Sequence, residues 1–240
     1  MTEGHPPGPE FPRRLAAEAI GTFALVFVAA GADTMARVSH GDVTAAARAV
    51  APGLLVGAMV YAIGDVSGAH FNPAVSFAFT VKGLFPARWL PGYWAAQIVG
   101  ALVAALLLRA LFGSAVEAGV STPHVDASIA LVLEIVLTAL LVTVILGTAD
   151  RARVVGPNAA LAVGATIALC GLIALPIEGA SMNPARSFGP ALVAGRAQDL
   201  WLYVLGPAAG ASVAAVITRL LHGGQAPDGK DQEAAQGQGG

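Results

Sequence analysis

The sequence predicts an all-α integral membrane protein with six membrane-spanning helices and two shorter helices that enter the membrane without crossing it. Composition is the first observation. Residues of the set AVILMFWYC make up 56% of the 240 positions, glycine adds 29 more, and charged residues account for only 12%. Soluble domains carry about 25% charged residues. So few charges could not cover a soluble surface, which excludes a soluble enzyme as the leading interpretation.

Net charge and cysteine content exclude further classes. The net charge of −2 gives no electrostatic basis for binding nucleic acid. The single cysteine, Cys170, excludes an intrachain disulfide framework and a cysteine-rich metal site. Residues 1–12 contain four prolines and no apolar core, so they are not a signal peptide. We expect residues 1–12 and the polar, Gly/Gln-rich residues 222–240 to be disordered tails.

Six apolar runs approach the roughly 20 residues that cross a bilayer. They lie at Leu15–Ala32 and between the charged pairs Arg48 and Asp65, Arg88 and Arg109, Asp126 and Asp150, Arg153 and Glu178, and Asp199 and Arg219. The second run is short and has Pro52 near its start. Glu18 lies within the first run and Glu134 within the fourth.

Two further apolar segments, Asn72–Val81 and Asn183–Val193, are too short to span a membrane. Each begins with the tripeptide Asn-Pro-Ala, which comprises Asn72, Pro73 and Ala74 in one case and Asn183, Pro184 and Ala185 in the other. Proline is favoured at the first position of a helix because its missing N–H has no helical partner there. Each tripeptide therefore predicts the N-terminus of a helix about half a membrane long.

The two tripeptides belong to an internal duplication. They are 183 − 72 = 111 residues apart, and the segment around Glu18 resembles that around Glu134 at an offset of 116. Each copy holds three spans and one half-helix. Because three is odd, the copies must have opposite orientations in the membrane, an arrangement that places broken helices near the midplane. We expect one channel domain over residues 13–221, with repeats at about 13–112 and 127–221.

The paired half-helices predict a pore that rejects cations. Non-helical backbone survives at membrane depth only inside the protein or beside water. Two half-helix N-termini that meet there present positive dipole ends to a cation or hydronium ion, whereas a neutral solute is not repelled. The amides of Asn72 and Asn183 can cap their helices and still donate to a passing water.

Residues 67–75 (SGAHFNPAV) and 182–190 (MNPARSFGP) resemble the aquaporin, or major intrinsic protein, family. The resemblance covers about residues 13–221. It implies a six-helix bundle with two half-helices, one pore in each subunit of a homotetramer, and passive flow of water or small uncharged solutes across the lipid bilayer. It implies no cofactor and no enzymatic activity.

The same resemblance places an outer selectivity filter at Pro52, Gly171, Ala180 and Arg186. Water-selective members have an aromatic residue and a histidine at the first two positions, and this sequence has neither. A wide opening would pass glycerol, urea or similar neutral solutes. The alternative, a strictly water-selective channel, is favoured by Ser187 after the arginine and by the short spacing of the repeats.

Other polar residues have expected supporting roles. We expect Glu18 and Glu134 each to accept backbone N–H groups from the half-helix loop in its own repeat. His70 either lines the inner vestibule or braces its loop. Glu178, near the outer opening, could pair with Arg186 or attract cations.

Two further functions stay open at this stage. A secondary transporter also has inverted repeats and broken helices, but it needs converging carboxylates for a coupling ion, which only Glu18 and Glu134 offer. A purely structural junction protein would show no flux. An intramembrane hydrolase lacks a recognisable nucleophile and base in the sequence.

The basic residues predict the orientation, because cytoplasmic loops are enriched in Lys and Arg. Cytoplasmic termini place eight of them inside: Arg13, Arg14, Lys82, Arg88, Arg151, Arg153, Arg219 and Lys230. The same topology leaves four outside: Arg37, Arg48, Arg109 and Arg196. Asp65 then lies hydrated near the cytoplasmic end. Either a plasma membrane or a bacterial inner membrane fits this topology.

Overall fold

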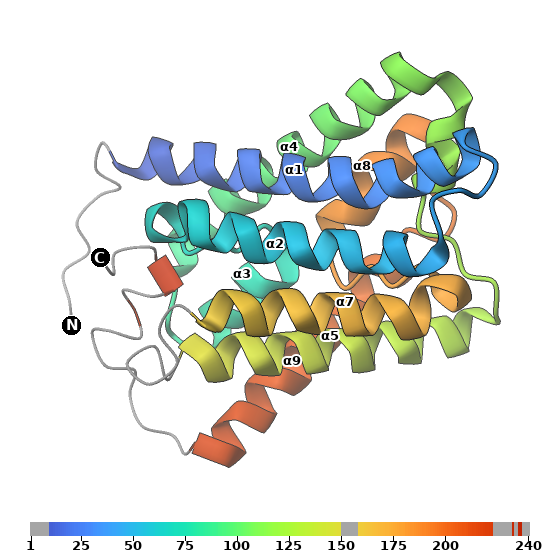
Figure 1. Cartoon of the computed structure of the whole chain (residues 1–240). Coiled ribbons are helices and arrows are strands. Elements are labelled where there is room, and N and C mark those ends of the chain that lie inside the picture. The colour runs from blue at the N-terminus through green and yellow to red at the C-terminus, as the bar shows by residue number, and fades with distance from the viewer. Residues whose placement is uncertain (1–9, 150–157, 223–231, 233–234, 237–240) are drawn as a thin grey trace.

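The structure is a computed structural model that describes residues 10–149, 158–222, 232, 235 and 236, and every regular element in these residues is a helix (Figure 1). Six are long: α1 (Glu10–Val38), α2 (Ala45–Ser67), α4 (Leu90–Phe112), α5 (Ala127–Ala149), α7 (Asn158–Glu178) and α9 (Leu202–His222). Two are short: α3 (Pro73–Val81) and α8 (Pro184–Ala194). The 3₁₀ turns η1 (Ala87–Trp89) and η2 (Gly113–Gly119) flank α4.

The six long helices are each apolar and long enough to cross a membrane. Their outer faces carry large exposed apolar side chains, among them Leu54, Leu161, Ile173 and Leu220. In water, such a continuous apolar surface would drive aggregation, whereas a lipid environment covers it. The chain is therefore an integral multi-pass membrane protein, and the predicted fold class is confirmed.

The helix boundaries differ from the predicted spans mainly at charged residues. The helix α1 extends beyond Leu15–Ala32 at both ends, so Glu10–Pro12, assigned to a tail from the sequence, are helical. Charged side chains near a span's end can reach toward water or pair inside the protein, and so they need not end the helix. Residues 1–9, Arg151, Arg153 and most of residues 223–240 lie outside the described residues.

Pro52 lies inside α2, in the first half of the helix. The helix begins earlier, at Ala45, where the Thr44 hydroxyl accepts a hydrogen bond of 3.2 Å from the backbone N–H of Ala47. This cap satisfies one of the N–H groups that the first turn leaves without a helical acceptor.

The two repeats pack in the same way. In the first, α1 packs along α4, and in the second, α5 packs along α9, while α2 and α7 join the halves. Glycines permit this close approach: a Cβ on Gly100 would lie 2.2 Å from the carbonyl oxygen of Ala19, and one on Gly210 would lie 2.5 Å from that of Ile135. Small residues at helix contacts are typical of membrane bundles, where backbones must approach closely to gain packing energy.

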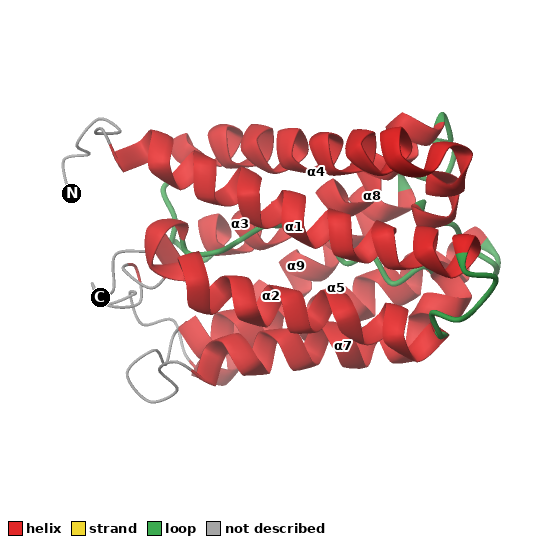
Figure 2. Cartoon of the chain, turned by 45° about the horizontal axis from the view of Figure 1, so that its top comes forward, coloured by secondary structure: helices red, strands yellow, loops and turns green. Residues whose placement is uncertain are grey.

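The short helices lie within the bundle (Figure 2). The helix α3 lies toward the end where α1 begins, and α8 lies toward the opposite end (Figures 1 and 2). Both were predicted from their Asn-Pro-Ala starts, and their N-termini meet through the hydrogen bonds described next.

Candidate channel site

Each Asn-Pro-Ala tripeptide starts a short helix with an asparagine cap. The Oδ1 atom of Asn72 accepts a 2.9 Å hydrogen bond from the N–H of Ala74, and that of Asn183 accepts one of 3.0 Å from Ala185. The proline after each asparagine occupies the first helical position. The local sequence thus satisfies N–H groups that have no acceptor within the helix.

The same asparagines join the two half-helices. The Nδ2 of Asn72 donates to the carbonyl of Met182 at 2.8 Å, and the Nδ2 of Asn183 donates to the carbonyl of Phe71 at 2.9 Å. An amide nitrogen carries two hydrogens. One hydrogen of each is therefore committed to the opposite loop, and the other is available to a molecule in the space beside it.

The loop before α3 is held by Glu18, which is fully buried. Its Oε1 accepts from the Ser67 hydroxyl at 2.7 Å and the His70 N–H at 2.9 Å. Its Oε2 accepts from the Phe71 N–H and the Gln97 side-chain amide, both at 2.8 Å. Four donors on one carboxylate are strong compensation for its burial.

The loop before α8 is held by Glu134. This buried carboxylate accepts from the N–H of Ser181 at 2.6 Å and from that of Met182 at 2.9 Å. The predicted contact of each glutamate with the backbone of its own half is therefore present in the structure.

Glu178 is the last residue of α7, near the outer opening as predicted, but one of its two expected contacts is absent. Its side chain is fully buried, and its Oε1 accepts a 2.9 Å hydrogen bond from the N–H of Ala180. The expected pairing with Arg186 is wrong, because that guanidinium pairs with Asp33. The buried side chain of Glu178 instead turns to the backbone of the loop that follows α7, two residues later.

Both loops contain non-glycine residues in the left-handed region. The φ angles are +50° at Ala69, +48° at Phe71, +42° at Ala180 and +53° at Met182. The two pairs are 111 residues apart, so the same backbone path occurs in both halves. Such angles persist only where surrounding contacts enforce them, and here the glutamates bind the N–H groups while the asparagines bind the carbonyls of Phe71 and Met182.

One cavity of about 610 Å³ runs past both asparagines. At one end it is lined by Asp33, Arg48 and Arg186, and at the other by Asp65 and His70. The four positions assigned to a filter from the sequence also line it: Pro52, Gly171, Ala180 and Arg186. We call these four residues the constriction.

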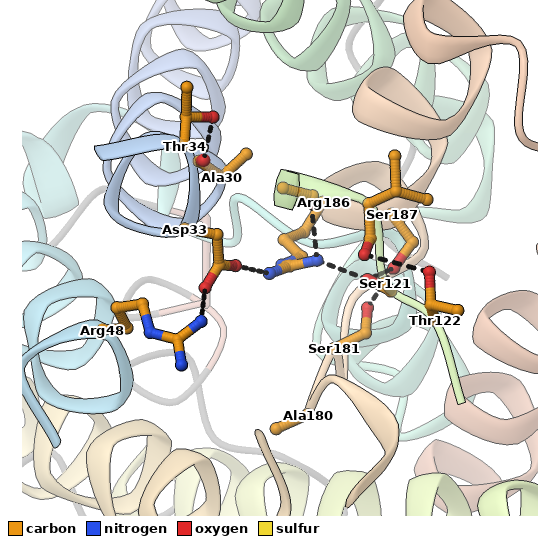
Figure 3. Close-up of polar contacts among 12 residues, drawn as sticks. Ala30, Asp33, Thr34, Arg48, Ser121, Thr122, Ala180, Ser181, Arg186 and Ser187 are labelled. Carbon is orange, nitrogen blue, oxygen red and sulfur yellow. Dashed lines mark hydrogen bonds and ion pairs between the residues drawn. The ribbon is translucent and has the colours of Figure 1, made fainter. Parts of the chain in front are cut away.

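Arg186 is anchored on two sides, and its side chain is only 7% exposed. Its Nη1 donates to the Ser121 hydroxyl and, at 3.3 Å, to the Gly119 carbonyl. Its Nη2 lies 3.4 Å from Oδ2 of Asp33, whose Oδ1 lies 3.0 Å from Nη1 of Arg48 (Figure 3). The result is a chain of three charges, with one carboxylate between two guanidinium groups.

Sequence reasoning missed Asp33 and Arg48. Both are charged residues beside the predicted spans, where composition indicates only the end of a span. The available signal was the duplication: at the offset of 116 that relates Glu18 to Glu134, Asp33 corresponds to Ala149. An acid where the other repeat has alanine is not required by the fold.

His70 lies at the other end of the cavity, and both of its expected roles have support. It lines the cavity. Its Nδ1 lies 2.9 Å from the Ser76 hydroxyl and its Nε2 lies 2.9 Å from the Ala235 carbonyl. Its ring stacks on Phe79 with 4.8 Å between centroids. These contacts fix the ring against the loop.

The family comparison agrees with the paired tripeptides, the inverted repeat and the shared cavity. A family model described as "Major intrinsic protein" matches residues 8–218. The chain belongs to this family. It is 48% identical over 202 residues to "Aquaporin NIP1-1" of Oryza sativa subsp. japonica, covering 84% of this chain and 71% of the relative. It is 47% identical over 212 residues to "Aquaporin NIP1-1" of Zea mays, covering 88% and 75%.

The fold comparison agrees. A structure of the aquaglyceroporin from Plasmodium falciparum superposes with a TM-score of 0.77 at 22% identity, covering 87% of this chain and 95% of that one. By its family model and its plant relatives, the chain is an aquaporin-type channel protein and not an enzyme.

Proposed function

We propose that this protein is a passive channel for water and small uncharged solutes of the glycerol or urea class. The supporting observation is that one continuous cavity passes both Asn72 and Asn183 and is lined by all four residues of the constriction. A transmembrane channel requires such continuity, and the cavity contacts residues near both ends of the bundle.

Ion exclusion in this proposal comes from the meeting half-helices. The N-terminus of each helix carries a partial positive charge, and both point to the region where Asn72 and Asn183 cross-link the loops. A water molecule there accepts from the two remaining amide hydrogens. Its own hydrogens then point away from the junction, which interrupts a proton-conducting chain of waters.

Solute size in this proposal is set at the constriction. Pro52, Gly171 and Ala180 bring little side-chain volume, and Arg186 is held to one wall by Gly119, Ser121 and Asp33. Selectivity among neutral solutes follows pore diameter and lining groups. An opening without an aromatic ring admits molecules larger than water as well as water itself.

The test is a substitution that narrows the constriction. Stopped-flow light scattering on proteoliposomes measures water efflux and glycerol uptake for the native protein and for Pro52→Phe. We expect the native protein to pass both, and the substitution to reduce glycerol flux about tenfold while water flux falls far less, because pore diameter limits the larger solute. Leu54→Phe is the matched control, since Leu54 is 69% exposed on the outer face of the same helix.

Each alternative function has its own signature in this assay. Glycerol flux at the level of empty vesicles, with fast water flux, would establish the strictly water-selective alternative. Saturable flux that depends on an ion gradient would establish a secondary transporter. Absence of both fluxes would leave a structural junction protein.

We further propose a homotetramer with both termini in the cytoplasm. The basic residues support the orientation, and the exposed apolar faces of the helices leave surface for subunit contacts as well as lipid. A cysteine placed at the exposed Asp42, between α1 and α2, should react with an impermeant maleimide added outside intact cells. Cross-linking in the membrane should stop at four subunits.

A further inference from the structure

Asp33 is an acidic side chain placed at the constriction. It is 6% exposed, it lines the cavity, and its two oxygens lie 3.0 Å from Nη1 of Arg48 and 3.4 Å from Nη2 of Arg186. Burying a carboxylate is costly unless charges and donors compensate it. Two guanidinium groups from different elements supply that compensation here.

The fold itself does not demand this acid. The corresponding position in the second repeat is Ala149, which also lines the cavity, near its opposite end. Two equivalent positions on α1 and α5 thus face the same space, one with a carboxylate and one with a methyl group. The difference indicates a task specific to the Arg186 end of the channel.

The side chains of the constriction can donate hydrogen bonds to a solute but cannot accept them. The side chains of Pro52, Gly171 and Ala180 carry no hydrogen-bonding group, and a guanidinium only donates. A carboxylate only accepts. Asp33, which lines the cavity beside Arg186, is therefore the charged acceptor there for a hydroxyl or amide of a solute.

We propose that Asp33 is a further selectivity residue, which together with Arg186 favours neutral solutes that both donate and accept hydrogen bonds, such as polyols and urea-type amides. This inference rests on the proposed function. A solute hydroxyl donates to Asp33 while its oxygen accepts from Arg186, which offsets the loss of hydration at the constriction. Asp33 also holds the guanidinium against the wall, on the side opposite Ser121 and Gly119.

The test is Asp33→Asn, which keeps the shape and removes the charge. Proteoliposome assays give the ratio of glycerol to water flux and, separately, of urea to water flux. We expect water flux within about twofold of the native value and both ratios lowered about threefold or more, because hydrogen bonds to charged groups are stronger than those to neutral ones. Asp33→Glu keeps the carboxylate and should retain more of each ratio than Asp33→Asn.

Glu117→Gln is the matched control for charge alone. Glu117 forms a 2.8 Å ion pair with Arg196 and lines the outer opening together with Asp33 and Arg186, but it does not line the cavity that passes the asparagines. Removing its charge alters the electrostatic field of the opening by the same unit and leaves the constriction intact. Its flux ratios should match those of the native protein.

The outcomes separate cleanly. Unchanged ratios in Asp33→Asn overturn the inference, as do equal losses of water, glycerol and urea flux, which would make Asp33 a structural support. Equal lowering of the ratios by Glu117→Gln overturns it too, because the effect would then be general electrostatics. If the native protein passes water alone, the proposed solute class fails, and this inference fails with it.

Discussion

In both halves a buried glutamate holds the loop before the half-helix, but the side chains around that glutamate differ. Glu18 accepts from two backbone N–H groups and also from Ser67 and Gln97. In the second half, Glu134 again accepts from two backbone N–H groups, but the positions that correspond to Ser67 and Gln97 hold Glu178 and Pro207. The side chain of Pro207 has no hydrogen-bond donor, and at the position of the Ser67 hydroxyl the second half has a second acid, Glu178.

The features that both halves share are those that the backbone path of each loop requires. Both keep the glutamate, the capping asparagine and a tyrosine that donates to a carbonyl: Tyr93 to Ser67 and Tyr203 to Glu178. Both also keep a side-chain contact between the same two positions, which is His70 with Ser76 in the first half and Ser181 with Ser187 in the second. The remaining partners are interchangeable as long as the buried donors and acceptors are satisfied.

Substituting the two glutamates should give the largest difference between the halves. In Glu18→Gln, the new NH₂ replaces an oxygen that accepts two hydrogen bonds, whichever oxygen is lost. In either orientation the backbone N–H of His70 or that of Phe71 loses its acceptor, which costs about 2 kcal/mol of unfolding free energy. In Glu134→Gln, the amide can replace Oε2, because the Met182 N–H also lies 3.3 Å from Oε1. The NH₂ can then donate to Glu178.

Thermal unfolding of the detergent-solubilised protein checks this comparison. We expect Glu18→Gln to lower the unfolding temperature clearly and Glu134→Gln to lower it by less than half as much. Equal losses would show that the two glutamates depend on charge itself rather than on the number of donors that each one satisfies.

A second contrast concerns the residues that pack on the strained turns. A Cβ on Gly21 would lie 2.0 Å from the ring of Phe71, which is held at both its N–H and its carbonyl. In the second half, the corresponding Leu137 packs in one cluster with the flexible Met182. The first half thus packs the ring of Phe71 on Gly21, whereas the second half packs the thioether of Met182 on Leu137.

Gly21→Ala should therefore cost about 1–3 kcal/mol of unfolding free energy, the usual range for overpacking. Gly31→Ala on the same helix is the control, because its Cβ would meet only Leu108 at an ordinary 3.5 Å. That control should be neutral or slightly stabilising, since alanine is the better helix former. A stable Gly21→Ala protein would mean that the Phe71 ring can move despite its backbone contacts.

The sequence predicted the parts of this molecule that repeat. Apolar runs located six spans, and the doubled tripeptide located both half-helices and led to the glutamate contacts. It did not predict the pairing of Asp33 with Arg186, because such a contact depends on how α1, α2 and α8 pack, which local patterns do not encode. The pairing of Glu178 with Arg186 was wrongly predicted for a related reason. Its position in the chain is close to the opening, but the end of α7 directs its side chain into the protein.

The smallest predicted effect is also the sharpest test of the comparison. Glu178→Ser would give the second half the residue that the first half has at this place. Ser67 donates to Glu18 at 2.7 Å and accepts from the N–H of Ala69 at 3.1 Å. A serine at 178 can donate to Glu134 and accept from Ala180 in the same way. It also removes an acid that, like Glu134, is buried within a membrane-spanning helix, where a carboxyl is costly.

We therefore expect the unfolding free energy of Glu178→Ser to stay within about 1 kcal/mol of the native value, because the substitution exchanges one satisfied hydrogen-bonding pair for another. Water and glycerol fluxes should also be retained, since Ala180 keeps its N–H acceptor. The converse change, Ser67→Glu, should be more costly, because Glu18 already has four donors and a second carboxylate would displace one of them. If Glu178→Ser instead destabilised the protein as strongly as Glu18→Gln, the two halves would not be interchangeable at this position. The carboxyl of Glu178 would then be a required support of the Ala180 turn.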